Sequence, residues 1–121
     1  IRAIIYMPEH APITKVNATE RFGGEVVLHG KSFDEALAGA RQRAEEDNLT
    51  FIHAFDDDAV IAGQGSIGLE ILSQNPFVEA VLAPIGGGGL IGGIACAVKE
   101  TNPKIKVVGV QTTQVPSMVE A

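Results

Sequence analysis

The chain has 121 residues, a net charge of −6 and an apolar fraction of 45%. These values are typical of one modest globular α/β domain or parts of two, and they exclude a disordered segment. The acidic balance and the lack of a basic stripe argue against nucleic acid as a partner. Because Cys96 is the single cysteine, an internal disulfide is impossible, and we expect a cytoplasmic location.

Residues 80–98 carry no charge and approach the length that spans a bilayer. Pro84 and six glycines between Gly86 and Gly93 would leave a lipid-facing helix broken and its backbone poorly hydrogen-bonded. We therefore predict a buried strand, a glycine loop and a buried helix here, with no membrane segment and no signal peptide.

Short β-branched runs alternate with longer helical segments along the chain. Ser32 and Glu35 form a capping box that opens a helix to about Asp47. A later helix should begin near Asp58 and be interrupted near residues 63–65. The other expected elements are strands at residues 3–7, 25–28, 51–53, 80–83 and 106–110, and helices at about 12–22 and 90–100. This alternation predicts an α/β fold with parallel twisted sheets and helices on both faces.

Residues 84–93 follow a buried strand and open a helix. Four consecutive glycines are costly in backbone entropy, so a stable fold keeps them only where side chains are not tolerated. At the carboxyl end of a parallel strand, such a loop can aim several backbone N–H groups at one point, where the helix dipole adds positive charge. The loop therefore predicts an anion site, normally for phosphate, at Gly86, Gly87, Gly88 and Gly89.

The spacing of the glycines can be compared with the patterns of two classes of phosphate-binding loop. A nucleoside-triphosphate loop requires Lys and then Ser or Thr, whereas Leu90 and Ile91 stand here. The pattern Gly87-x-Gly89-x-x-Gly92 fits the dinucleotide fingerprint, although Gln111 stands where that fingerprint needs an acid. A nucleotide-binding module without catalysis thus remains an alternative.

Five segments in order resemble the fold-type II pyridoxal-phosphate enzymes, and within them the threonine/serine dehydratases: residues 6–16, 24–28, 55–57, 61–70 and 84–90. The resemblance covers essentially the whole chain. It implies that backbone amides of Gly86, Gly87, Gly88, Gly89 and Leu90 hold the phosphate of pyridoxal 5'-phosphate.

The resemblance also implies a function and a domain organisation for the parent protein. The expected enzyme is a threonine ammonia-lyase that converts L-threonine, with L-serine as a second candidate, to a 2-oxo acid and ammonia. Residues 1–54 would belong to the smaller α/β domain and residues 55–121 to the larger cofactor-binding domain, in a homo-oligomer, a dimer or tetramer.

The chain departs from the family pattern in two respects. The family's Ser-Phe-Lys-type motif, which carries the lysine that binds the cofactor, has no match between Ile1 and Ala121. We therefore expect an internal fragment with no catalytic residue of its own. Some family members, such as serine racemases, bind a divalent cation through two acidic side chains. This chain has the neutral residues Gln111 and Ser117 at those positions, so we predict no metal site. The remaining lysines and histidines are expected at the surface, in loops or at strand ends: Lys15, Lys31, Lys99, Lys104, Lys106, His10, His29 and His53.

Overall fold

The computed structural model describes residues 1–114 and 116–120. The chain divides into two compact units, Ile1–Phe51 and Ile52–Ala121. Each unit contains one two-stranded parallel sheet with helices packed against it, so the expected α/β class is confirmed. Within the described residues, no helix is both long enough and apolar enough to cross a membrane.

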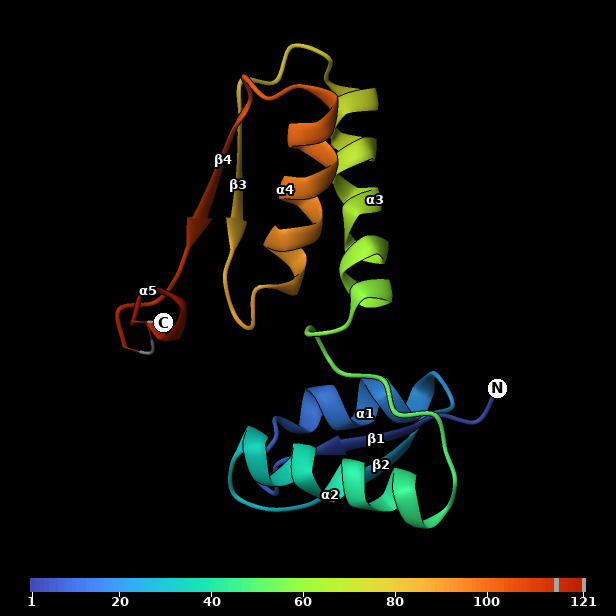
Figure 1. Cartoon of the computed structure of the whole chain (residues 1–121). Helices are drawn as coiled ribbons and strands as arrows, with labels where there is room; N and C mark the ends of the chain where they lie inside the picture. Colours follow the sequence, from blue (N-terminus) through green and yellow to red (C-terminus); the bar gives the residue numbers. More distant parts are fainter. Residues whose placement is uncertain (115, 121) are drawn as a thin grey trace. The chain divides into compact units, whose positions relative to one another are not determined.

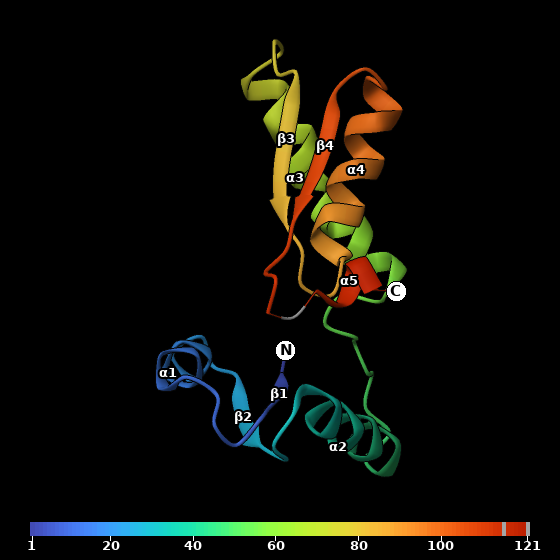
Figure 2. The same ribbon diagram turned by 90° about the vertical axis from the view of Figure 1, so that its left-hand side faces the viewer.

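The first unit is built from two strands and two helices. The strands pair in parallel, with Ile4 opposite Glu25 and Met7 opposite Leu28. In Figures 1 and 2 the two helices lie on opposite faces of this sheet. The elements are β1 (Ile4–Met7), α1 (Ile13–Arg21), β2 (Glu25–Leu28) and α2 (Phe33–Glu46).

The capping box that the sequence predicted at the start of α2 is confirmed. The Ser32 hydroxyl oxygen accepts a hydrogen bond from the Glu35 backbone N–H at 3.2 Å. The Glu35 carboxylate in turn accepts one from the Lys31 backbone N–H at 2.6 Å. Two donors that would otherwise lack helical partners are therefore satisfied, which fixes where the helix begins.

The second unit carries the glycine loop. Its strands pair in parallel from Ala80 opposite Lys106 to Pro84 opposite Val110. The elements are α3 (Asp58–Gln74), β3 (Ala80–Pro84), α4 (Gly89–Thr101), β4 (Lys106–Val110) and the short α5 (Ser117–Glu120). Helix α4 packs on the sheet and α3 packs on α4 (Figure 1). The core lies between these layers and contains Val81, Ala83, Ile94, Val98 and Ile105.

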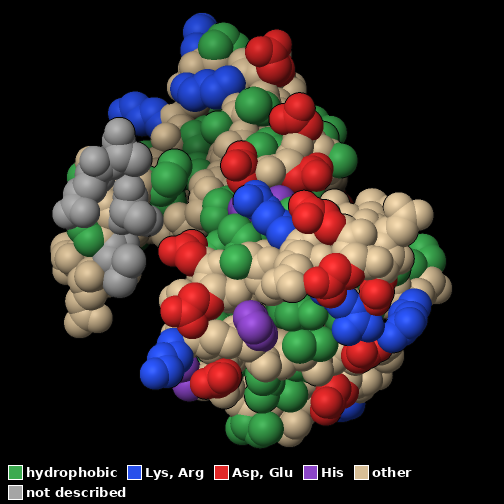
Figure 3. All heavy atoms as spheres, turned by 60° about the horizontal axis from the view of Figure 1, so that its bottom comes forward, with side chains coloured by type: hydrophobic (Ala, Val, Ile, Leu, Met, Phe, Trp, Pro, Cys, Tyr) green, Lys and Arg blue, Asp and Glu red, His purple; other side chains and the backbone are tan. Residues whose placement is uncertain are grey.

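Among the described residues, helices cover only one face of the sheet in the second unit. Along β3, Val81 and Ala83 are buried, whereas Leu82 is 67% exposed. On β4, Val108 is opposite Leu82 and is 43% exposed. The predicted placement of helices on both faces of a sheet is therefore not found for this sheet among the described residues. On the side of the molecule drawn in Figure 3, hydrophobic side chains lie at the surface among acidic and basic ones.

Two predicted local features are wrong. Residues 51–53 form no strand, because neither described sheet offers this short run a strand to pair with. Helix α3 runs without interruption from Asp58 to Gln74, through residues 63–65. The glycines stay helical because α4 packs closely on them. A methyl group on Gly65 would lie 3.2 Å from the carbonyl oxygen of Gly93, and one on Gly68 would lie 3.1 Å from that of Ile94.

At the same contact, Gly93 of α4 lies close to the backbone of α3. A methyl group on Gly93 would overlap the carbonyl oxygen of Ile61 and lie 2.7 Å from the backbone nitrogen of Gly65. At Gly92 the nearest atom is 3.9 Å away, on the side chain of Ile61, so that glycine is not required by packing. The backbones of α3 and α4 therefore approach each other closely at Gly65, Gly68 and Gly93, but not at Gly92.

Replacement of Gly93 by alanine should lower the free energy of unfolding by about 1–3 kcal/mol, because the new methyl group meets backbone that cannot rotate away. Gly63→Ala is the matched control, since nothing lies within 4 Å of its methyl position. It should raise stability by about 0.5–1 kcal/mol through helix propensity. Urea unfolding followed by circular dichroism measures both, and equal effects would contradict this account of the helix contact.

Candidate functional site

A cavity of about 400 Å³ opens in the second unit beside the glycine loop. The carboxyl ends of β3 and β4 and the N-termini of α3 and α4 lie at the same end of this unit (Figure 1). The lining comes from the turn before α3, the first turns of α3 and the β3–α4 loop: Ala54, Phe55, Val60, Gln64 and residues 84–90. The cavity therefore lies where two helix N-termini contribute partial positive charge.

The β3–α4 loop presents backbone donors to this cavity. Ile85 continues the sheet, since its N–H donates to the carbonyl oxygen of Val110 at 2.8 Å. Gly88 has a φ of 91°, and the Gly92 N–H donates to its carbonyl oxygen at 2.8 Å to begin α4. Between these two anchors, the N–H groups of residues 86–90 donate to no acceptor within residues 1–114 and 116–120. They are available to a ligand.

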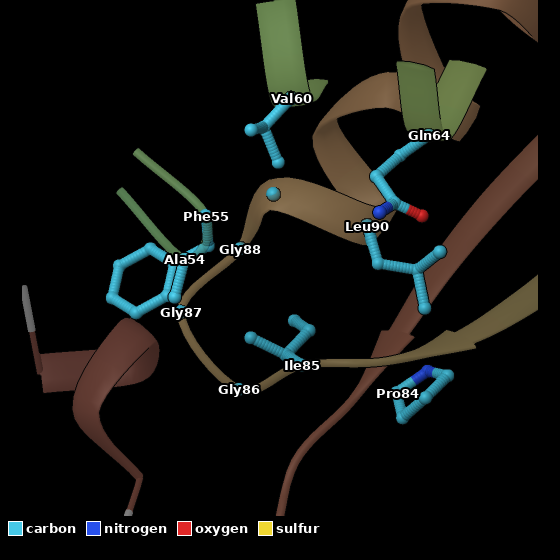
Figure 4. A pocket seen from close by; sticks show the side chains of 11 residues that line it. Ala54, Phe55, Val60, Gln64, Pro84, Ile85, Gly86, Gly87, Gly88 and Leu90 are labelled. Carbon is cyan, nitrogen blue, oxygen red and sulfur yellow. The ribbon is translucent and has the colours of Figure 1, made fainter. Parts of the chain in front are cut away.

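Phe55 lies against the loop in Figure 4, with its ring next to Gly87. A methyl group on Gly87 would overlap that ring. One on Gly89 would lie 2.6 Å from the carbonyl oxygen of Phe55 and 3.0 Å from its Cα. Two of the four loop glycines are therefore required by contact with Phe55. Gly86 differs, because nothing lies within 4 Å of its methyl position.

Helix α3 supplies the other wall of the cavity through Val60 and Gln64 (Figure 4). These two residues share a helix face because they are four positions apart. The start of the helix is fixed by Asp57, whose Oδ1 accepts hydrogen bonds from the backbone N–H groups of Ala59 at 2.8 Å and Val60 at 3.2 Å. Phe55, Val60 and Gln64 were not among the site residues predicted from the sequence. The helical spacing after a capping Asp was the signal available for the last two.

The residues considered for metal binding and catalysis lie elsewhere. Gln111 accepts a hydrogen bond through Oε1 from the Met118 backbone N–H at 3.2 Å, and the Ser117 side chain lies outside the described atoms. In the described part of the chain, no three His, Cys, Asp or Glu residues gather as metal ligands would. The five lysines are all exposed, and none lines the cavity. The expectation that the chain binds no metal remains a prediction.

Comparison with known proteins assigns the whole chain to one family model, described as "Pyridoxal-phosphate dependent enzyme", which matches residues 1–121. The chain is 52% identical over 117 residues to an L-threonine ammonia-lyase of Geobacter sulfurreducens and 50% identical over 119 residues to one of Thermotoga maritima. These matches cover 97% and 98% of this chain, but 29% and 30% of the two relatives.

A solved structure gives the same result at the level of the fold. The processed form of threonine deaminase isoform 2 from Solanum lycopersicum matches with a TM-score of 0.85 and 46% sequence identity. That match covers 97% of this chain and 34% of the tomato protein chain. The chain therefore spans about a third of the length of the proteins it resembles.

Alanine at Gly87 or Gly89 should each lower the free energy of unfolding by about 1–3 kcal/mol, because both methyl groups meet Phe55. In a Phe55→Ala background the cost at Gly87 should fall strongly, since the three atoms nearest to its methyl position all belong to the Phe55 ring. The cost at Gly89 should persist, because backbone atoms oppose it. A double-mutant cycle by chemical denaturation separates the two, and a cost at Gly87 that is the same in both backgrounds would contradict the contact with the ring.

Proposed function

Because the chain belongs to the family of pyridoxal-phosphate dependent enzymes, we propose that its glycine loop holds the phosphate of pyridoxal 5'-phosphate. The residues that provide the donors are Gly86, Gly87, Gly88, Gly89 and Leu90. The observation that carries this proposal is the run of backbone N–H groups, without acceptors among the described residues, that line the cavity at the start of α4.

The residues present fit an anionic group. Each free N–H is a strong donor whose burial under a ligand requires an acceptor, and a phosphate offers several acceptor oxygens. The start of α4 adds the positive end of the helix dipole. Gly86 leaves space where any side chain would project, which allows a ligand to approach the backbone. Phe55 and Val60 add apolar walls beside the donors.

For the parent protein we propose the conversion of L-threonine to a 2-oxo acid and ammonia, with L-serine as a second candidate substrate. The names of the bacterial relatives and of the tomato enzyme support this proposal. Pyridoxal phosphate supplies the electron sink for such chemistry when it is bound. The proposed role of this chain is to bind and orient the cofactor. We propose no residue of the chain for proton transfer.

The alternative of a dinucleotide-binding module is not favoured. The family match covers the whole chain. In addition, Gln111 stands where the dinucleotide fingerprint needs an acid, and its side-chain oxygen accepts a hydrogen bond from the Met118 backbone. An amide in that position does not provide the carboxylate that accepts hydrogen bonds from a ribose.

We further propose that residues 1–54 belong to the smaller domain of the parent protein and residues 55–121 to the larger, cofactor-binding domain. The division of the chain between Phe51 and Ile52 supports a boundary in this region. A homo-oligomer, a cytoplasmic location, a small amino-acid substrate and the absence of nucleic-acid and membrane partners complete the proposal.

Gly86→Ala tests the cofactor site separately from the fold. Because its methyl group meets no protein atom, the variant should unfold at the same urea concentration as the wild type within error. We call residues 86–90 the phosphate cradle. A methyl group on Gly86 would take up space beside the proposed phosphate, so the dissociation constant for pyridoxal 5'-phosphate should rise about tenfold, the equivalent of losing one good contact. Equilibrium dialysis of the full-length protein with absorbance detection measures this constant.

Gly63→Ala is the control for this experiment, since its methyl position is equally open but lies outside the cavity. It should bind the cofactor as tightly as the wild type. If Gly86→Ala binds pyridoxal 5'-phosphate with unchanged affinity, the loop does not hold the phosphate, and the proposed site is wrong. Turnover of L-threonine, followed through the 2-oxo acid released, tests the reaction independently.

A further inference from the structure

His53 is a buried polar residue that the proposed reaction does not use. The residue is 9% exposed, and it lies in the second unit before α3, next to the cavity-lining residues Ala54 and Phe55. The Nδ1 atom accepts hydrogen bonds from the backbone N–H of Asp56 at 2.8 Å and from that of Phe55 at 3.3 Å. The imidazole thus closes a tight turn on its own backbone.

Two backbone N–H donors converge on Nδ1 of His53. An imidazole nitrogen that accepts hydrogen bonds carries no proton, so the proton of the neutral ring is on Nε2. The His53 ring also packs edge-to-face on Phe55, with ring centroids 4.6 Å apart and an interplanar angle of 89°. His53 therefore restrains both the backbone and the ring of Phe55.

One peptide group connects His53 to the glycine loop. The Asp56 N–H, which His53 binds, and the Phe55 carbonyl belong to the same planar unit, and the described chain contains no cis peptide bond. In a trans peptide the N–H and C=O groups point in opposite directions. The hydrogen bond to His53 on one side thus fixes the carbonyl oxygen on the other, which lies against Gly89. The Phe55 ring likewise lies against Gly87.

We propose that His53 is a positioning residue for the phosphate cradle. By fixing the Phe55–Asp56 peptide and the Phe55 ring, it holds the backbone around Gly87 and Gly89, whose N–H groups must converge on one phosphate. This inference rests on the proposed function, because it assumes that residues 86–90 bind that phosphate. Its specific consequence is that His53 affects affinity for the phosphate group more than affinity for the rest of the cofactor.

The test uses two substitutions that each retain one end of the imidazole. Asparagine places an oxygen acceptor on the δ position, where Nδ1 is, whereas glutamine carries its polar atoms one bond further out, where Nε2 is. His53→Asn should therefore keep the turn, as Asp57 does for the next one, and bind pyridoxal 5'-phosphate within about threefold of wild type. His53→Gln should bind it about tenfold more weakly.

Pyridoxal, which lacks the phosphate, is the second probe in the full-length protein. The affinity of the protein for pyridoxal should be nearly the same in wild type, His53→Asn and His53→Gln, because pyridoxal has no phosphate group for residues 86–90 to bind. A loss of affinity for both probes would show that His53 only supports the fold and would overturn the proposal. So would His53→Gln binding pyridoxal 5'-phosphate as tightly as wild type, or His53→Asn binding it as weakly as His53→Gln.

Hydrogen exchange keeps the proposal falsifiable if His53→Gln does not fold. The Phe55 and Asp56 amides should be as protected in His53→Asn as in wild type, together with near-normal cofactor affinity. Lost protection with unchanged affinity would overturn the positioning role. The two proposals fail in different experiments. An unchanged cofactor affinity in Gly86→Ala rejects the phosphate site itself. Contrary affinities in the His53 variants reject only the positioning role of His53.

Discussion

The carbonyl group of Phe55 lies against Gly89, where a methyl group would be 2.6 Å from its oxygen. This contact joins the segment that leads into α3 to the loop that leads into α4, and so it brings the N-termini of both helices to the edge of one cavity. The glycine contacts at Gly65, Gly68 and Gly93 continue the close approach along the two helices. If the backbones could not meet there, the walls of the cavity would separate and the loop donors would no longer face a common point.

The candidate site is built from backbone rather than from charged side chains. Within the part of the chain that the structure describes, its lining contains no Lys, Arg or His. An anion would therefore be held by N–H groups and helix dipoles, which do not titrate in the physiological range. Such a site depends on geometry, because no flexible cationic side chain can follow a misplaced ligand. The loop is therefore sensitive to the residues packed against it, of which Phe55 contacts Gly87 and Gly89.

Local chemistry made part of the fold predictable. The capping box of Ser32 and Glu35 identified the start of α2, and the β-branched runs gave the bounds of β2 and β4 as the structure has them. Predictions failed where a distant partner decides the conformation. Residues 51–53 have strand-like composition, but within residues 1–114 and 116–120 no strand lies beside them. The glycines of residues 63–65 remain helical because α4 packs on them. Neither partner can be recognised from the segment itself.

The amino-acid sequence by itself determined that a glycine loop follows an apolar strand and opens a helix, and hence that backbone donors gather there. It did so because the absence of side chains, the strand-to-helix order and the helix dipole are local properties. Only the tertiary structure decided which glycine serves which purpose: Gly87 and Gly89 make room for Phe55, Gly88 adopts a positive φ, and Gly86 leaves open space. Those distinctions depend on atoms from segments that are distant along the chain, and they become fixed only when the second unit packs.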